Sequence, residues 1–173
     1  MSPISDEPFH RAPERLDLGT AGEILTLQRA AYVTEAQAHD DLYLPPLSQT
    51  LTGLRIELMR ESVSAWGFRD SGRLVAAVRV DSAGAIARLG RLVVAPDRQG
   101  QGWGSRLLAA AEQSCPTGVG TVELFTGEHS HANLRLYHRF GYRETHRIAA
   151  GTYQLIHLSK TLPASETAGT EHT

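Results

Sequence analysis

The first third of the chain has the apolar spacing of helices. Thr20 can cap a helix over about 21–33, whose apolar residues fall on one helical face. The two prolines within 44–47 disfavour helix in the residues that precede them, so this segment is expected to be extended. A second helix is expected over about 48–61. The residues predicted to face the core from these two helices are Ile24, Leu25, Leu27, Ala31, Leu51, Leu54, Leu58 and Met59.

From residue 64 the apolar pattern changes to that of β-strands. Short apolar runs at 64–68 and 74–80 flank the turn signal Asp70-Ser71-Gly72, and a longer run follows at 86–94. Short links of this kind join antiparallel strands. We therefore expect three consecutive strands that pair antiparallel.

The second half of the chain predicts one parallel crossover. A helix over about 104–114 lies between the strand at 86–94 and a strand at 119–126, and such a connection makes the two strands parallel. The remaining elements are expected to be a helix over about 130–140 and strands at 142–148 and 153–160. The fold class is therefore α/β (α+β), with a mixed, mostly antiparallel sheet of about six to seven strands flanked by helices. A doubly wound sheet would need repeated crossovers.

Length and composition favour one soluble domain. The chain has 173 residues, and its hydrophobic share of 41% and charged share of 21% are ordinary for a globular protein. We expect a single domain over 1–163 and a flexible tail over 164–173, which is small and polar. Residues 1–9 carry two acids and lack the apolar core of a secretory signal, and no apolar run is long enough for a membrane helix. A cytoplasmic protein without a membrane partner is the expectation.

Charge and metal-ligand content exclude some function classes. The net charge of −2 lacks the basic excess of a nucleic-acid binder, so no nucleic-acid partner is expected. Cys115 is the single cysteine, and His129 and His131 form only a two-residue pair. These residues match no zinc-site spacing, so no metal site is predicted.

A glycine-rich loop between a strand and a helix predicts an anion site. Gly100, Gly102 and Gly104 stand at alternate positions where the helix over 104–114 begins. Glycine allows positive φ and close approach, and the free amides of a first helical turn attract phosphate. A P-loop would need Gly-Lys-Ser/Thr, which is absent, and a dinucleotide fingerprint would need glycine where Ser105 stands. A nucleotide-binding oxidoreductase is therefore a weaker alternative.

Two motifs together resemble the GNAT superfamily of acyl-CoA N-acyltransferases. The family's phosphate loop, Arg/Gln-x-x-Gly-x-Gly/Ala, is matched by the six residues 99–104. The segment Leu136-Tyr137-His138-Arg139-Phe140-Gly141-Tyr142 resembles the family's Leu-Tyr-x-x-x-Gly-Phe helix end, and 92–96 resembles its bulged fourth strand. The resemblance covers about 64–160, and it implies that the fourth and fifth strands splay apart.

The resemblance implies acetyl-CoA as the cosubstrate and assigns residues to it. Backbone groups of the bulged strand would pair the pantetheine arm and hydrogen-bond the thioester oxygen, while amides of the loop would hold the pyrophosphate. The family asparagine seven residues before the tyrosine is replaced by Ser130, and Asn133 lies one helical turn later, so either residue could make this contact. The implied coenzyme-binding residues are Leu92, Val93, Val94, Gln99, Gly100, Gln101, Gly102, Trp103, Gly104, Ser105, Ser130 and Asn133.

The resemblance also implies the catalytic step, a direct attack of an amine on the thioester in a ternary complex. Tyr137 would protonate the leaving thiolate, since a phenol with a pKa near 10 remains protonated at neutral pH. The family's glutamate bases fall at positions occupied here by Arg88 and Phe125, so no base is carried over. The candidates for the base are Glu35, Glu123 and His129. A chain of water molecules is the alternative to all three.

The acceptor is not named by the sequence. Small amines, amino acids, antibiotics and protein N-termini are all compatible with the sequence as acceptors. The sequence is also compatible with a homodimer. Glu35, Asp40 and Asp41 cluster between the two expected N-terminal helices, and carboxylates there would attract a cationic amine. We therefore expect a positively charged small molecule or peptide amine. The alternative function is a non-catalytic acyl-CoA-binding or regulatory domain of the same fold.

Overall fold

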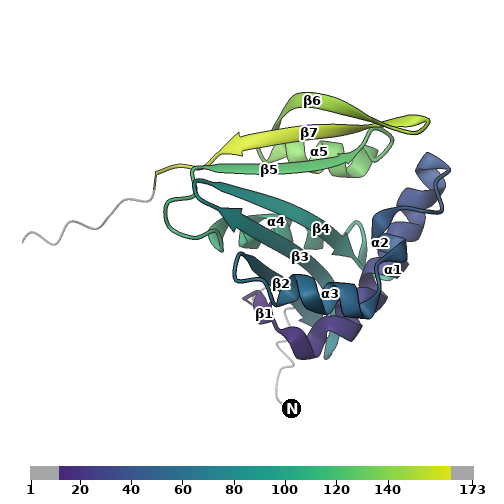
Figure 1. The fold of residues 1–173 in the computed structure, drawn as a ribbon. Coiled ribbons are helices and arrows are strands. Elements are labelled where there is room, and N and C mark those ends of the chain that lie inside the picture. The colour runs from purple at the N-terminus through teal and green to yellow at the C-terminus, as the bar shows by residue number, and fades with distance from the viewer. Residues whose placement is uncertain (1–11, 165–173) are drawn as a thin grey trace, which may run out of the picture.

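A seven-stranded sheet forms the centre of the molecule in the computed structural model, which describes residues 12–164. The strand order is β1-β2-β3-β4-β5-β7-β6 (Figure 1). The expectations for the first nine residues and for the tail beyond residue 164 concern segments outside this range. The elements are β1 (Glu14–Leu16), the 3-10 turn η2 (Leu18–Thr20), α1 (Ala21–His39), α2 (Pro45–Ser48), α3 (Leu51–Leu58), β2 (Val63–Asp70), β3 (Arg73–Ala83), β4 (Ile86–Val94), the 3-10 turn η3 (Pro96–Arg98), α4 (Trp103–Gln113), β5 (Thr121–Gly127), α5 (His131–Arg139), β6 (Arg143–Ala150) and β7 (Tyr153–Thr161).

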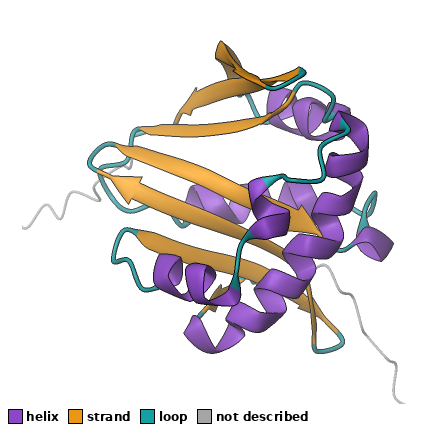
Figure 2. Cartoon of the chain, turned by 45° about the vertical axis from the view of Figure 1, so that its right-hand side comes forward, coloured by secondary structure: helices purple, strands orange, loops and turns teal. Residues whose placement is uncertain are grey.

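Helices cover both faces of the sheet. α1, α2 and α3 lie over one face, and α4 and α5 lie over the other (Figures 1 and 2). The helix predicted over about 104–114 is present as α4, and its residues Leu107, Leu108 and Ala111 are fully buried. All neighbouring strands pair antiparallel except β4 and β5, so the predicted mixed sheet is confirmed. None of the helices within residues 12–164 is long and apolar enough to cross a membrane.

The N-terminal helices differ from the expectation. α1 continues to His39, so Glu35 lies inside this helix and not in a loop after it. The segment expected to be extended begins a single helical turn, α2, because proline is tolerated in a first turn, where its missing N–H has no helical partner. Thr50 then caps α3, and Met59, predicted to face the core, is exposed because the helix ends at Leu58. The short edge strand β1 was not predicted.

Strands β4 and β5 separate after only three residue pairs. They pair from Ile86↔Thr121 to Arg88↔Glu123, and the rest of the β4 edge has no neighbouring strand, so the predicted splay is confirmed. A β-bulge also interrupts the pairing of β3 with β4 at this point, where two residues of β4, Arg91 and Leu92, stand opposite a single residue of β3. Arg91 has a φ of 53°, in the left-handed region. A bulge of this kind re-aims the side chains next to it, here at the mouth of the splay.

A buried polar network fixes the N-terminal helices on β3. Arg79 is only 4% exposed, and its guanidinium donates to Glu57 at 2.7 Å and to Gln28 at 3.0 Å. Gln28 also donates to the carbonyl of Pro46 at 2.8 Å and to Gln49 at 3.0 Å. Since buried polar groups are costly without partners, this set of bonds ties α1, α2 and α3 to one point of the sheet.

Candidate functional site

The glycine loop leads into α4 through two glycines that have positive φ. Gly100 has a φ of 74°, and Gly102, the N-cap of α4, has a φ of 86°. A Cβ at either position would meet no protein atom within 4 Å, so the backbone angle and not crowding requires glycine. The first amides of the helix lack carbonyl partners within it and carry the positive end of its dipole. These free amides are groups that can bind an anion.

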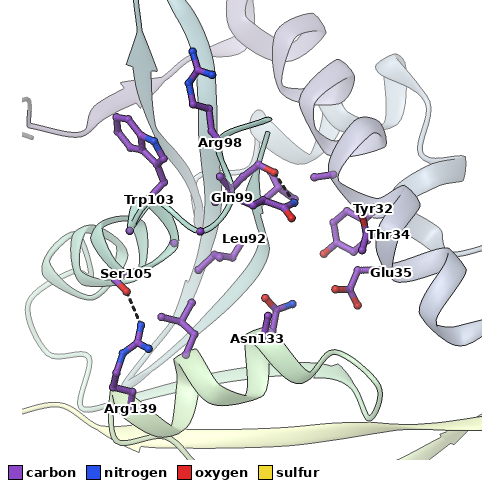
Figure 3. Close-up of a pocket in the computed structure, with 18 residues that line it drawn as sticks. Tyr32, Thr34, Glu35, Leu92, Arg98, Gln99, Trp103, Ser105, Asn133 and Arg139 are labelled. Atoms are coloured by element: carbon purple, nitrogen blue, oxygen red, sulfur yellow. Dashed lines mark hydrogen bonds between the residues drawn. The ribbon is translucent and has the colours of Figure 1, made fainter. Parts of the chain in front are cut away.

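A cavity of about 460 Å³, called here the loop cavity, lies between this loop, α1 and α5 (Figure 3). Gln99 lines it and donates to the carbonyl of Val94 at 3.2 Å, which fixes the loop against the free edge of β4. Of the predicted coenzyme-binding residues, only Gln101 and Ser130 do not line it. The predicted residues that do are Leu92, Val93, Val94, Gln99, Gly100, Gly102, Trp103, Gly104, Ser105 and Asn133.

Trp103 belongs to the core as well as to the wall of the loop cavity. Its side chain is buried, and its ring centroid lies 5.7 Å from that of Phe68 on β2. Gly104, one residue later, is packed against α5, because a Cβ there would lie 3.4 Å from Leu136. The large residue in the loop thus anchors the start of α4 on the sheet.

A second cavity, called here the inner cavity, has a volume of about 390 Å³ and lies on the other side of the bulge. It is lined by the C-terminal part of α1, by Pro45 and Pro46, by the bulge, and by parts of β5, α5 and the β6–β7 hairpin. Its wall contains apolar groups such as Phe125 and Leu155 beside a few polar ones, the composition typical of small-molecule sites.

Four residues line both cavities: Tyr32, Glu35, Leu92 and Asn133. They come from α1, the bulge of β4 and α5, and Figure 3 shows Tyr32, Glu35 and Asn133 pointing into the same space. A ligand that extended from the glycine loop along the free β4 edge would reach this junction. The two cavities are therefore parts of one site, and the junction is the place where two ligands could meet.

Glu35 is held at the junction by its neighbours. The hydroxyl of Ser130, which is buried at the start of α5, donates to the Glu35 carboxylate. One turn further along α1, the Nδ1 of His39 is 2.9 Å from the Glu35 carbonyl, and its Nε2 accepts from the backbone N–H of His129 at 3.1 Å. His39 Nδ1 is therefore the protonated nitrogen, and the end of α1 is joined to the residues that follow β5.

Tyr137 lines the inner cavity from α5 and is 5% exposed. Burial raises the pKa of its phenol, and the charge of Glu35 acts in the same direction. The hydroxyl therefore remains protonated well beyond neutral pH. A buried, neutral phenol in the wall of the inner cavity is available as a proton donor.

Three other candidates lie away from the junction. Glu123 is on β5 at the paired end of the splay, where its carboxylate is 3.3 Å from Arg88, and it lines neither cavity. His129 contributes its backbone N–H to His39, and its side chain faces Glu128 at 4.0 Å. Asp40 ends α1 in a left-handed conformation and is exposed, whereas Asp41 lines the inner cavity and accepts from Tyr153 at 2.8 Å.

The sequence analysis missed several residues of the site. Arg98 and Arg139 line the loop cavity, and Arg139 donates to Ser105 at 2.8 Å. Arg98 directly precedes the glycine-loop motif and Arg139 lies within the Leu-Tyr motif, so basic residues at these two motifs were the available signal. Tyr32 and Arg91 gave no such signal, because their places in the site depend on the packing of α1 over the bulge.

Comparisons of the sequence and of the fold with known proteins both find acetyltransferases. Residues 47–152 match the family profile described as an acetyltransferase (GNAT) domain. The PaiA N-acetyltransferase from Thermoplasma acidophilum, solved in complex with coenzyme A, is similar in structure, with a TM-score of 0.69, 15% identity, and coverage of 85% of this chain and 98% of that one. The ribosomal-protein-S18-alanine N-acetyltransferase from Escherichia coli has a TM-score of 0.70 at 18% identity, with coverage of 90% and 97%. No curated protein matches the sequence.

A splayed mixed sheet with a glycine loop before α4 defines the acyltransferase class of fold to which these structures belong. The family match spans more than half of the chain. The chain therefore belongs to the GNAT acetyltransferase family, as its two motifs indicated.

Proposed function

We propose that this protein transfers an acetyl group from acetyl-CoA to the amine of a small acceptor, in a complex that holds both substrates. The observation that carries the proposal is the junction of the two cavities, where the loop cavity would receive the coenzyme and the inner cavity the acceptor. The family membership and the coenzyme A complex of the PaiA neighbour support this choice of cosubstrate.

The loop cavity offers two kinds of coenzyme contact. The amides of the glycine loop and of the first turn of α4 would bind the pyrophosphate, and Arg139 adds positive charge at the same cavity, where Arg98 is paired with Asp70 and Asp97. The free edge of β4 after Arg88 would pair the pantetheine arm as an added strand. Asn133 lines both cavities, and Ser130 is occupied with Glu35, so we assign the α5 contact with the coenzyme to Asn133.

The residues at the junction would divide the proton transfers between them. Glu35 would take a proton from the ammonium group of the acceptor, so that the neutral amine attacks the thioester carbon. A backbone amide of the bulge would stabilise the negative charge on the carbonyl oxygen. As the carbon–sulfur bond breaks, Tyr137 would donate its proton to the thiolate. The extra proton on the nitrogen would then restore the Tyr137 phenol, and Glu35 would release its proton to solvent. The carboxylates of Glu35 and Asp41 would attract the ammonium group to the inner cavity.

Replacement of Tyr137 by phenylalanine tests the proposed function. The variant should bind acetyl-CoA with the affinity of the wild type in calorimetry, while kcat for amine acetylation falls by about 10²–10⁴-fold because the proton donor is lost. Because burial raises the pKa of Tyr137, wild-type kcat should show no decline through pH 10. Coenzyme binding without turnover of any amine would instead favour the non-catalytic acyl-CoA-binding or regulatory function. An unchanged kcat in the variant would assign Tyr137 to packing alone.

A further inference from the structure

Arg91 is a cation in the wall of the inner cavity that has no carboxylate partner among residues 12–164. Its Nε is buried without a hydrogen-bond partner, the only such side-chain atom within the described range. Arg91 interacts with Tyr32. Burial raises the pKa of the Tyr32 phenol, and the charge and hydrogen bond of Arg91 lower it to a smaller extent. Arg91 as a whole is half-buried, and a guanidinium that is partly withdrawn from water gains from an anionic partner.

A side pocket of about 190 Å³, called here the arginine pocket, opens beside the inner cavity and shares Tyr32, Arg91 and Phe125 with it. The other charged residues that line the arginine pocket are already paired. Their ion pairs are Arg79–Glu57 at 2.7 Å, Asp81–Arg60 at 2.9 Å and Arg88–Glu123 at 3.3 Å. Arg91 is therefore the one charge of this wall that the described residues leave uncompensated.

The position of Arg91 is unusual for a side chain that only packs. It occupies the bulge with a φ of 53°, a backbone conformation that costs a residue with a side chain roughly 1–2 kcal/mol. Leu92, the next residue, lines both cavities, so the bulge directs Arg91 to the acceptor side of the point where the thioester would lie. Strain of this kind is retained where the conformation serves a site.

We propose, on the basis of the function proposed above, that the acceptor carries a carboxylate close to its amine and that Arg91 binds this carboxylate. The ammonium group would face Glu35 and Asp41, and the carboxylate would face Arg91, so the inner cavity matches a zwitterion better than a cation. The apolar wall formed by Phe125, Leu155 and Pro45 then favours an amino acid with an apolar side chain. Arg91 is a specificity-determining residue in this proposal, and it replaces the expectation of a net positive acceptor.

Matched acceptors test this proposal directly. Phenylalanine, leucine and methionine are each compared with their amides and with their decarboxylated amines, and kcat/KM is measured with saturating acetyl-CoA. Wild-type enzyme should prefer the free acids by about 10- to 100-fold, the range expected for a charge-assisted pair of hydrogen bonds. In Arg91→Asn, which keeps a residue that tolerates positive φ, the acid and its amide should be acetylated at similar rates.

Two further variants separate recognition from folding. Arg91→Lys retains the charge without the planar fork and should keep part of the preference for acids. Arg147→Gln removes an exposed arginine of β6 that pairs with Glu144 and lines neither cavity, and its preference should equal that of the wild type. Because the acid-to-amide ratio is measured within each variant, a partly unfolded sample lowers both rates and leaves the ratio unchanged.

The outcomes distinguish the two proposals. If the wild type acetylates amides and decarboxylated amines as well as the acids, or if Arg91→Asn keeps the preference, the role of Arg91 is overturned while the acetyltransferase stands. If acetyl-CoA binds but no carboxylate-bearing amine is acetylated, the proposed acceptor class is also overturned. If acetyl-CoA does not bind, the proposed function itself fails.

Discussion

The loop cavity and the inner cavity are neighbours built in different ways. The loop cavity takes its essential groups from one contiguous stretch, in which the backbone of residues 99–105 supplies the amides and glycine supplies their geometry. The inner cavity takes single side chains from α1, α2, β4, β5, α5 and the β6–β7 hairpin. Backbone chemistry is the same in every chain, so the first cavity suits a constant ligand, and the second can be altered one side chain at a time.

The largest expected effect compares the two carboxylates considered as the base. Glu35→Gln should lower kcat by about 10²–10⁴-fold, because it removes a proton acceptor at the junction while keeping a side chain that can bind Ser130. Glu123→Gln is the matched control and should behave as the wild type, since Glu123 pairs with Arg88 outside both cavities. The affinity for acetyl-CoA should stay the same in both variants. Equal losses of kcat in the two variants would contradict the assignment of the base to Glu35 at the junction and not to Glu123.

The next effect concerns the loop cavity alone. Gly102→Asp should weaken coenzyme A binding by about 100-fold, since a carboxylate would face the phosphates at the start of α4. Gly118→Asp is the control: Gly118 also has a positive φ, with open space around it, and it lines neither cavity. The two variants therefore share the backbone strain and the added charge. A difference between their coenzyme A affinities in calorimetry then reports the effect of the carboxylate on phosphate binding. Similar affinities would argue against an anion site at Gly102.

The smallest effect divides the two residues considered for the α5 contact. Asn133→Ala should weaken acetyl-CoA binding by about 5- to 10-fold, the worth of one hydrogen bond. Ser130→Ala should leave this affinity unchanged and lower kcat by less than tenfold, because only the orientation of Glu35 is loosened. The reverse pattern in titration calorimetry and steady-state kinetics would reassign the contact to Ser130.

Local signals in the sequence predicted the fold, which is confirmed, and the coenzyme-binding residues, which stay a prediction. The glycine spacing and the Leu-Tyr motif each consist of residues that are close in the sequence, so motif analysis detects them. The extent of α1 was underestimated, because the polar residues after Val33 are helical through packing and through the His39 contact with His129. Intrinsic helix propensity carries no information about such a tertiary contact.

The cationic acceptor stays a prediction, and it was made from only part of the charge that lines the inner cavity. Counting the carboxylates near residues 35–41 predicted a cationic acceptor, but Arg91 lies about fifty residues away in the chain and enters the same cavity through the bulge. Asp40, which was counted, is turned out of the cavity by the left-handed end of α1. The charge of a cavity therefore follows from the folding of distant segments and not from a local cluster.

The cleft between β4 and β5 is tied at both of its ends. Three residue pairs join the strands at one end, and at the other His39, at the end of the α1 helix that packs on β4, accepts a hydrogen bond from the backbone that follows β5. A side chain at Gly127 would clash with the His39 ring, so this hydrogen bond requires glycine at position 127. A cleft held at both ends has its shape before a ligand binds. Coenzyme binding should therefore order little of the chain, and its heat-capacity change should match the apolar surface buried on contact alone.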